Sequence, residues 1–205
     1  MHDYDYRLSF VSSCVKRAFD IIFSAFGILL FWWIILFAAL LARFDTGLNG
    51  FFTQQRVGRD GRLFKVIKIR TMKPFSNLVT TVTTENDARI TATGRFFRKT
   101  KIDELPQLIN VLLGDMSFVG PRPDVPGFAD MLVGDERSVL SIRPGITGPA
   151  TLQYRNEEQL LASVDDPERY NRDVIFPDKV RINLEYIRNY SLTNDLKYIV
   201  KTIIG

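Results

Sequence analysis

Residues 98–123 read RKTKIDELPQLINVLLGDMSFVGPRP, and the other parts of the chain are interpreted from them. The stretch contains an adjacent carboxylate pair, Asp103 and Glu104. Behind the pair, apolar residues recur at helical spacing: Leu105, Leu108, Ile109 and Leu112. Pro106 is tolerated only in a first helical turn, where its missing N–H has no intrahelical partner to lose. A helix is therefore predicted to begin close to Asp103, beside unpaired N–H groups that attract phosphate.

Positive charge flanks this pair. Arg98, Lys99 and Lys101 precede it, and Arg122 follows between Pro121 and Pro123. A carboxylate among cations at a helix start suits chemistry on a phosphorylated substrate. Ordinary capping is an alternative, because aspartate is a preferred N-cap and meets the helix dipole favourably. These residues alone leave both interpretations open.

Composition limits the chemistry. The 205 residues carry a net charge of +4 and a pI of about 9.2, which fits nucleic acid, an anionic membrane face or a nucleotide-sugar substrate. The single cysteine, Cys14, excludes an intrachain disulfide. His2 is the only histidine, so Ser-His-Asp catalysis and histidine-rich metal sites are excluded. Neither usual phosphate-loop motif occurs. A metal here would be a hard cation held by carboxylates, for which Mg²⁺ is the natural candidate.

An apolar run near the N-terminus predicts a membrane helix. Residues 18–42 are apolar except for Asp20 and Ser24, and the 22 residues from Ile21 to Ala42 carry no charge. That length crosses a hydrocarbon core of about 30 Å. The predicted anchor therefore includes Ile21, Trp32, Trp33 and Ala42. The organisation that follows is an N-terminal cytosolic segment (residues 1–17), a membrane helix (18–43) and a cytosolic, membrane-associated catalytic domain (44–205).

The flanking charges predict that this helix re-enters the leaflet from which it came. Basic residues lie on both sides of the run, and positive charge prefers the cytoplasmic side. A re-entrant helix satisfies both flanks, whereas a spanning helix satisfies one. Ser24 and Gly27 could ease a bend, but the first proline is Pro74, so the usual helix breaker is missing.

The remaining segments give shorter signals. Residues 51–72 predict two strands joined by a turn at residues 58–61, with Lys68 and Arg70 on one strand face, where a solvated edge is the alternative to phosphate binding. Residues 73–90 predict a loop, either a lid or a segment without function. Residues 143–148 have a turn signature, in which Arg143 could face a phosphate or cap a helix. An apolar stripe with flanking lysines near the C-terminus predicts either a helix on an anionic membrane or packing on the domain: Leu196, Ile199, Val200 and Ile203.

With these residues in place, the chain resembles the bacterial sugar transferase family, the small monotopic phosphoglycosyl transferases. The resemblance runs from KRAFD at residues 16–20 to DLKYI at 195–199. Its most specific marks are FTQQRVG (52–58), FKVIKIRTM (64–72), RKTKIDELPQ (98–107), GDMSFVGPRP (114–123) and RPGITG (143–148). Five blocks in order are far more specific than any one motif. The chain departs from the family where a Ser-Pro pair often breaks the membrane helix, because Trp32-Trp33 occupies that place.

The resemblance implies an activity with named roles. The family transfers a sugar 1-phosphate from a UDP-sugar to polyprenyl (undecaprenyl) phosphate with Mg²⁺, releasing UMP. Asp103 matches the family's nucleophile, which would form an aspartyl-phosphosugar intermediate and also contact the metal, and Glu104 matches its partner. The positions implied for phosphate and nucleotide contacts are Lys68, Arg98, Pro121, Arg122, Pro123 and Arg143.

The expected fold is a helix-rich α/β single domain, with a re-entrant N-terminal helix, a small sheet and amphipathic helices at the membrane interface. The expected location is the cytoplasmic face of a bacterial inner membrane, where the enzyme would start surface-glycan assembly, such as exopolysaccharide or O-antigen, ahead of downstream glycosyltransferases. Nucleic acid is not an expected partner, and a homodimer is left open. The competing hypothesis is a membrane-tethered basic module that binds anionic lipid or nucleic acid.

Overall fold

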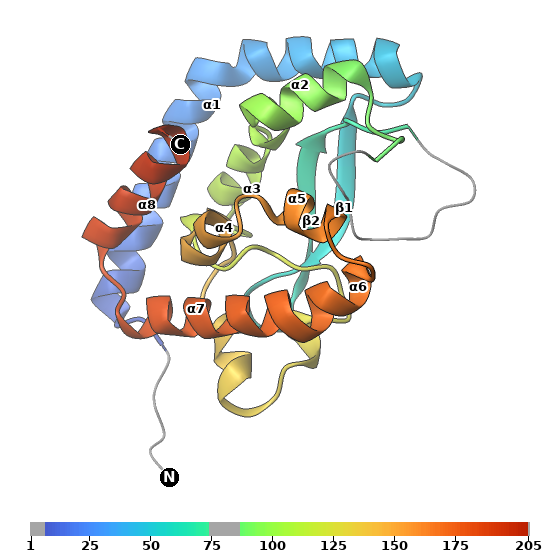
Figure 1. Cartoon of the computed structure of the whole chain (residues 1–205). Helices are drawn as coiled ribbons and strands as arrows, with labels where there is room; N and C mark the ends of the chain where they lie inside the picture. Colours follow the sequence, from blue (N-terminus) through green and yellow to red (C-terminus); the bar gives the residue numbers. More distant parts are fainter. Residues whose placement is uncertain (1–6, 74–86, 205) are drawn as a thin grey trace.

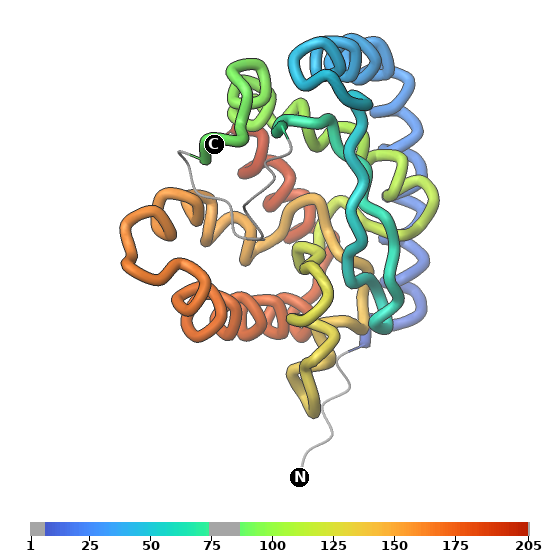
Figure 2. The backbone as a smooth tube through the Cα atoms, turned by 90° about the vertical axis from the view of Figure 1, so that its right-hand side faces the viewer, coloured from blue at the N-terminus to red at the C-terminus, as the bar shows by residue number. Residues whose placement is uncertain are grey.

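The longest element is α1 (Phe10–Thr46), a 37-residue helix that contains the whole apolar run. In the computed structural model, which describes residues 7–73 and 87–204, α1 turns sharply about midway along its length (Figure 1). In Figure 2 its second half is seen end-on while its first half runs vertically, so the bend is plain from both sides. The loop predicted at residues 73–90 lies mostly outside the described residues.

The bend occurs without proline, and the packing of α1 accounts for it. The Ser24 hydroxyl donates to the Ile21 carbonyl oxygen at 3.2 Å, a side-chain bond of the kind that bends helices. Gly27 allows α3 to come close, because a Cβ there would lie 3.1 Å from Cδ1 of Leu108. Ser24 and Gly27, which the sequence offered as the only aids to bending, are both buried against the domain.

The two halves of α1 pack on different partners. In the first half, Arg17 donates Nη1 to the carbonyl oxygen of Val111 and Nη2 to that of Leu112, at 2.6 and 2.8 Å, which satisfies the C-terminal end of α3 (Gln107–Leu113). In the second half, small and branched residues pack against Ile69 and Phe97: Ile35, Ala38, Ala39 and Ala42. Because both halves of the helix are held by these contacts, α1 curves around the central elements.

Those central elements are a hairpin and two helices. Strands β1 (Phe51–Val57) and β2 (Leu63–Ile69) pair antiparallel around a short 3₁₀ turn, Arg59–Gly61, as the sequence predicts. Helix α2 (Ala92–Thr100) and the 3₁₀ helix η2 (Ile102–Glu104) follow, and they lead into α3. Asn110 of α3 fastens the helix to β2, since its Oδ1 accepts from the Ile67 N–H and its Nδ2 donates to the Lys65 carbonyl oxygen.

The predicted turn at residues 143–148 is wrong. Gly145–Thr147 forms strand β4, which pairs in parallel with β3 (Ser117–Val119). Glycine is needed there for close approach of two backbones, because a Cβ at Gly145 would lie 2.2 Å from the Gly120 nitrogen and one at Gly148 2.4 Å from the Gly120 oxygen. The same glycines that signal a turn in a sequence therefore permit this crossing.

The C-terminal part is helical. Its elements are α4 (Pro149–Gln153), α5 (Glu157–Ala162), α6 (Pro167–Tyr170), a π-helical turn (Asn171–Ile175), α7 (Phe176–Arg188) and α8 (Leu192–Ile204). Two 3₁₀ segments, Ala129–Met131 and Gly134–Ser141, precede them. Asp195 of α8 ties this part to α1, because its carboxylate accepts from Lys16 Nζ at 2.5 Å and from the Tyr186 hydroxyl at 2.6 Å.

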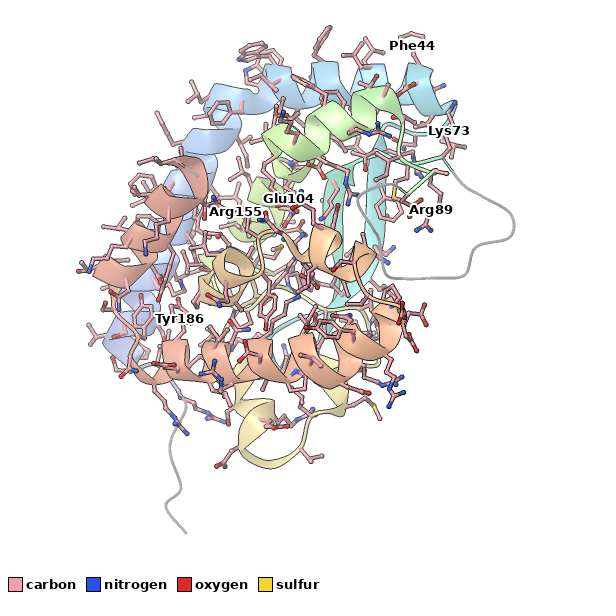
Figure 3. All side chains as sticks on the ribbon, in the orientation of Figure 1. Phe44, Lys73, Arg89, Glu104, Arg155 and Tyr186 are labelled. Carbon is pink, nitrogen blue, oxygen red and sulfur yellow. The ribbon has the colours of Figure 1, made fainter. Side chains whose placement is uncertain are left out.

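A large apolar surface is left uncovered along α1. Trp32 and Trp33 are 55% and 57% exposed, and Phe44, which projects from the top of the molecule in Figure 3, is 77% exposed. Of the predicted anchor residues, Ala42 instead lies in the core at 2% exposure, whereas Ile21 and both tryptophans face outward. The stripe on α8 is divided, since Ile199 packs on the domain while Leu196, Val200 and Ile203 are exposed. Helix α1 is long and apolar enough to cross a membrane.

Candidate active site

The carboxylate pair lies on a tight corner between α2 and α3. Lys101 ends α2 in the left-handed conformation, with φ 59°, and the chain then forms η2, which carries Asp103 and Glu104. Pro106 precedes the first residue of α3, close to the start predicted from the sequence. Neither η2 nor α3 has a side-chain N-cap bond. The capping interpretation therefore does not account for Asp103.

Glu104 binds two cations through one oxygen. Its Oε1 accepts from Lys68 Nζ of β2 at 3.1 Å and from Arg122 Nη2 at 2.8 Å. Burial alone would raise the pKa of Glu104, but Arg122, Lys68 and Lys101 hold that pKa well below its usual value. Glu104 is therefore a permanent anion, and it aligns Lys68 and Arg122 beside its neighbour Asp103. Glu104 is labelled in Figure 3, near the centre of the molecule.

Asp103 has the opposite character. It is 7% exposed, and its Oδ1 is buried without a hydrogen-bond partner among the described residues. Burial, together with the adjacent charge of Glu104, raises the pKa of Asp103 to about 6, against the opposing effects of Lys68, Arg98 and Lys101. A desolvated carboxylate with a free oxygen, surrounded by cations, is poised to attack an electrophile or to bind a cation.

The two prolines predicted to contact substrate hold Arg122 through their backbone. The Pro121 carbonyl oxygen accepts from the Gly145 N–H at 2.8 Å, and that of Pro123 accepts from Arg56 Nη1 at 3.1 Å. Both prolines are buried, whereas the Arg122 side chain is 40% exposed. The Pro-Arg-Pro segment thus presents one arginine from a rigid base, which is the arrangement that a phosphate clamp needs.

Two charged residues beside Arg122 were missed from the sequence. Burial and the nearby Arg122 lower the pKa of Arg56 to about 10, and burial raises the pKa of Asp124 to about 6. Arg56 lies within FTQQRVG and Asp124 directly follows Pro-Arg-Pro, so their places in or beside family blocks were the available signal. Their position predicts a supporting role around Arg122.

Helix α5 supplies acidic partners that the sequence did not connect with the site. Glu158 pairs with Arg98 of α2, and both oxygens of Glu157 accept from Lys179 Nζ at 2.7 and 2.6 Å. Arg98 also lies close enough to lower the pKa of Asp103. Lys68, Arg98 and Arg122 therefore converge on the carboxylate pair, from β2, α2 and the segment after β3.

Arg143 is not brought to this cluster. Its Nε donates to the Gly114 carbonyl oxygen at 2.8 Å, at the end of α3 opposite Asp103. No hydrogen bond or ion pair in residues 7–73 and 87–204 joins Arg143 to Asp103 or Glu104. Its charged neighbours are instead Arg17, Arg59 and Asp20.

The residues at the corner are compatible with Mg²⁺. No group of three or more potential metal-binding side chains occurs in the described part of the chain. Mg²⁺ usually keeps several waters and binds proteins through one or two carboxylates together with substrate phosphates. The buried, unpartnered Oδ1 of Asp103 meets that requirement, whereas Glu104 Oε1 is engaged by two cations.

With the geometry known, comparison with other proteins gives the family. The model described as bacterial sugar transferase matches residues 11–205. The chain belongs to the bacterial sugar transferase family. It is 37% identical over 205 residues to the UDP-glucose:undecaprenyl-phosphate glucose-1-phosphate transferase of Escherichia coli K12, covering 98% of this chain and 42% of that protein.

A shorter relative and a second long one are also similar. The exopolysaccharide production protein ExoY of Rhizobium meliloti is 32% identical, over 94% of this chain and 85% of its own length. The undecaprenyl-phosphate galactose phosphotransferase of Salmonella typhimurium is 34% identical, over 93% of this chain and 40% of its own length. The chain thus spans about two fifths of the longer sugar transferases and most of ExoY.

Removing the charge of Asp103 should stabilise the fold at neutral pH. Because the folded-state pKa is about 6, above an unfolded value of about 3.9, ionisation costs native stability as pH rises through this range. Asp103→Asn lacks this loss, so it should gain about 3 kcal/mol at pH 8 and little at pH 4. Thermal unfolding in neutral detergent at both pH values measures it.

The matched control is Asp135→Asn, which makes the same change on an exposed residue of the 3₁₀ segment Gly134–Ser141. It should not reproduce the pH-dependent gain. A destabilised Asp103→Asn protein at pH 8 would mean that the carboxylate is satisfied in the native state.

Proposed function

We propose that this chain is a phosphoglycosyl transferase that moves a sugar 1-phosphate from a UDP-sugar to polyprenyl phosphate, with Asp103 as nucleophile. The observation that carries the proposal is the contrast within the carboxylate pair. Glu104 is neutralised by Lys68 and Arg122, whereas Asp103 is buried, free at Oδ1 and close to the same cations. The E. coli and Salmonella relatives are named for transfers to undecaprenyl phosphate, and this supports the reaction class.

In the first step, a carboxylate oxygen of Asp103 attacks the phosphorus that carries the sugar. The new acyl-phosphate O–P bond forms as the bond from that phosphorus to the bridging oxygen breaks, and UMP leaves with the electron pair. Carboxylates are weak nucleophiles, so the phosphate charge must be neutralised and the attacking oxygen must be desolvated. Arg122 and Lys68 would contact the phosphate oxygens, and burial removes water from Asp103.

Arg98 would contribute once its partner is displaced. In the structure it pairs with Glu158 of α5, so the incoming pyrophosphate would compete with a side chain for the guanidinium. Mg²⁺ would be held by Asp103 together with substrate oxygens, where it would neutralise pyrophosphate charge.

In the second step, an oxygen of polyprenyl phosphate attacks the same phosphorus. The acyl-phosphate bond breaks, Asp103 regains its carboxylate, and the sugar remains on a lipid-linked pyrophosphate. The acceptor is insoluble in water, which gives the exposed apolar surfaces of α1 and α8 a purpose: they would seat the site at the depth of the lipid's phosphate. We place the enzyme at the cytoplasmic face of the inner membrane, with α1 re-entering the inner leaflet.

The catalytic roles are tested by UMP release. With a panel of UDP-sugars, undecaprenyl phosphate and Mg²⁺, Asp103→Asn should reduce UMP release at least 10³-fold, because the amide cannot form the acyl phosphate. Asp135→Asn should keep wild-type turnover. Retained turnover in Asp103→Asn would remove this residue from the mechanism, and would favour a binding module that is indifferent to Asp103.

The topology of α1 is tested by cysteine labelling. In a Cys14→Ser background, Asp3→Cys reports the N-terminal side and Arg169→Cys, an exposed position on α6, reports the catalytic domain. A re-entrant helix leaves both on one side, so an impermeant maleimide should label both or neither in sealed vesicles of one orientation. Labelling of only one would mean that α1 spans the bilayer.

A further inference from the structure

A cavity lined by several cations lies at the end of α3 opposite the carboxylate pair. It is walled by the start of α1, the tip of the β1–β2 hairpin and the segment before β4, and its polar lining includes Ser13, Lys16, Asp20, Arg59, Ser117 and Arg143. A wider hollow of about 470 Å³ adjoins it and shares Arg59 and Arg143. Since a water molecule takes up about 30 Å³, this hollow has room for a group much larger than a few waters.

Cations outnumber carboxylates along this cavity and the adjoining hollow: Arg7, Lys16, Arg59, Arg62 and Arg143 line them, against Asp20, Asp60 and Asp115. Within the described ranges, neither Arg17 nor Arg143 forms an ion pair, because both donate to backbone carbonyl oxygens of α3 and Gly114. Arg59 has only its exposed neighbour Asp60, at 3.4 Å. Asp20 is occupied by the Ser117 hydroxyl and the Phe118 N–H. Burial and the charges of Arg17 and Arg59 lower the pKa of Arg143, and they outweigh the opposing effect of Asp20.

The surroundings indicate which kind of anion would offset this excess of positive charge. Within one or two turns of Ser13 and Lys16, α1 exposes Phe10, Val11 and Val15, and the uncharged run begins at Ile21. The cavity therefore lies beside the point at which the apolar helix begins, level with the head groups if α1 is seated in a membrane as proposed above. Basic pockets at this depth attract acidic lipid head groups.

We propose that this cavity binds the phosphodiester head group of an acidic phospholipid, with Arg59 and Arg143 as its principal contacts. The lipid's acyl chains would lie along the exposed apolar face of α1. This site is separate from the acceptor and donor sites at Asp103, and it would fix the depth and tilt of the first half of α1. The proposal rests on the membrane seating of α1, and its binding test needs no turnover.

The test titrates the full chain in neutral detergent with a detergent-soluble phosphatidylglycerol carrying two six-carbon chains, followed by ³¹P NMR. Phosphatidylcholine with the same chains and inorganic phosphate are titrated separately. Arg59→Gln, half-exposed and bonded only to its neighbour, should fold normally and raise the Kd for phosphatidylglycerol about fivefold. Arg59→Gln with Arg143→Gln should raise it more than tenfold.

The matched control is Arg169→Gln with Arg172→Gln, which removes the same charge from exposed residues of α6 and the π-helical turn. It should leave the Kd unchanged. Equal loss in both double variants would mean diffuse surface attraction, and equal binding of phosphatidylcholine would exclude an anionic pocket; either result overturns the proposal. Inorganic phosphate binding as tightly as the lipid would overturn the lipid assignment. UMP release is assayed separately from lipid binding. Its loss would count against the proposed reaction and not against the lipid site.

Discussion

The arrangement of the site depends on one shared acceptor, Oε1 of Glu104. This oxygen accepts from both Lys68 and Arg122, so it fixes two cations on one side of the turn between α2 and α3. The negative charge of Glu104 is neutralised by these two cations. Asp103, one residue earlier, is left with the opposite electrostatics: buried, of raised pKa and free at Oδ1. Two adjacent carboxyl groups are thus differentiated by their surroundings into an anion that orients two cations and a buried carboxyl group with one free oxygen.

Contacts from several elements hold the turn between α2 and α3 in place. Lys68 comes from a strand pinned to α3 by Asn110, and Arg122 projects between two buried prolines whose carbonyl oxygens are both bonded. Arg17 of α1 closes the other end of α3. The corner is therefore supported by the helix that would enter the membrane, which links the chemistry physically to the depth of that helix.

Local patterns predicted much of this from the sequence. The apolar run gave α1, the Gly-rich turn between alternating segments gave the hairpin, and Pro106 located the start of α3 within a few residues. The clustering of Lys68, Arg98 and Arg122 around the pair was expected only from the family blocks. The residue spacing within one segment does not show which separate segments come together in the fold.

The predictions that were wrong, and the residues that were not predicted, depend on contacts between distant parts of the chain. The Pro-Gly signature at residues 144–145 is a turn signal locally, but the backbone of Gly120 lies against it, and that crossing makes a strand. By residue type Arg143 resembles a ligand of the substrate phosphates, yet it lies away from Asp103 and donates to the carbonyl oxygen of Gly114. Glu158 and Arg56 carry no local mark of their roles, since their partners are 60 and 67 residues away.

The most direct measurement of the central claim is the mass of Asp103 during turnover. The wild-type chain is mixed with UDP-sugar and Mg²⁺ without lipid acceptor, quenched in acid within the burst of UMP release, digested and examined by mass spectrometry. The account predicts that the peptide containing Asp103 gains the mass of one sugar phosphate, and that added polyprenyl phosphate removes it. A burst of UMP with an unmodified Asp103 peptide would contradict the account.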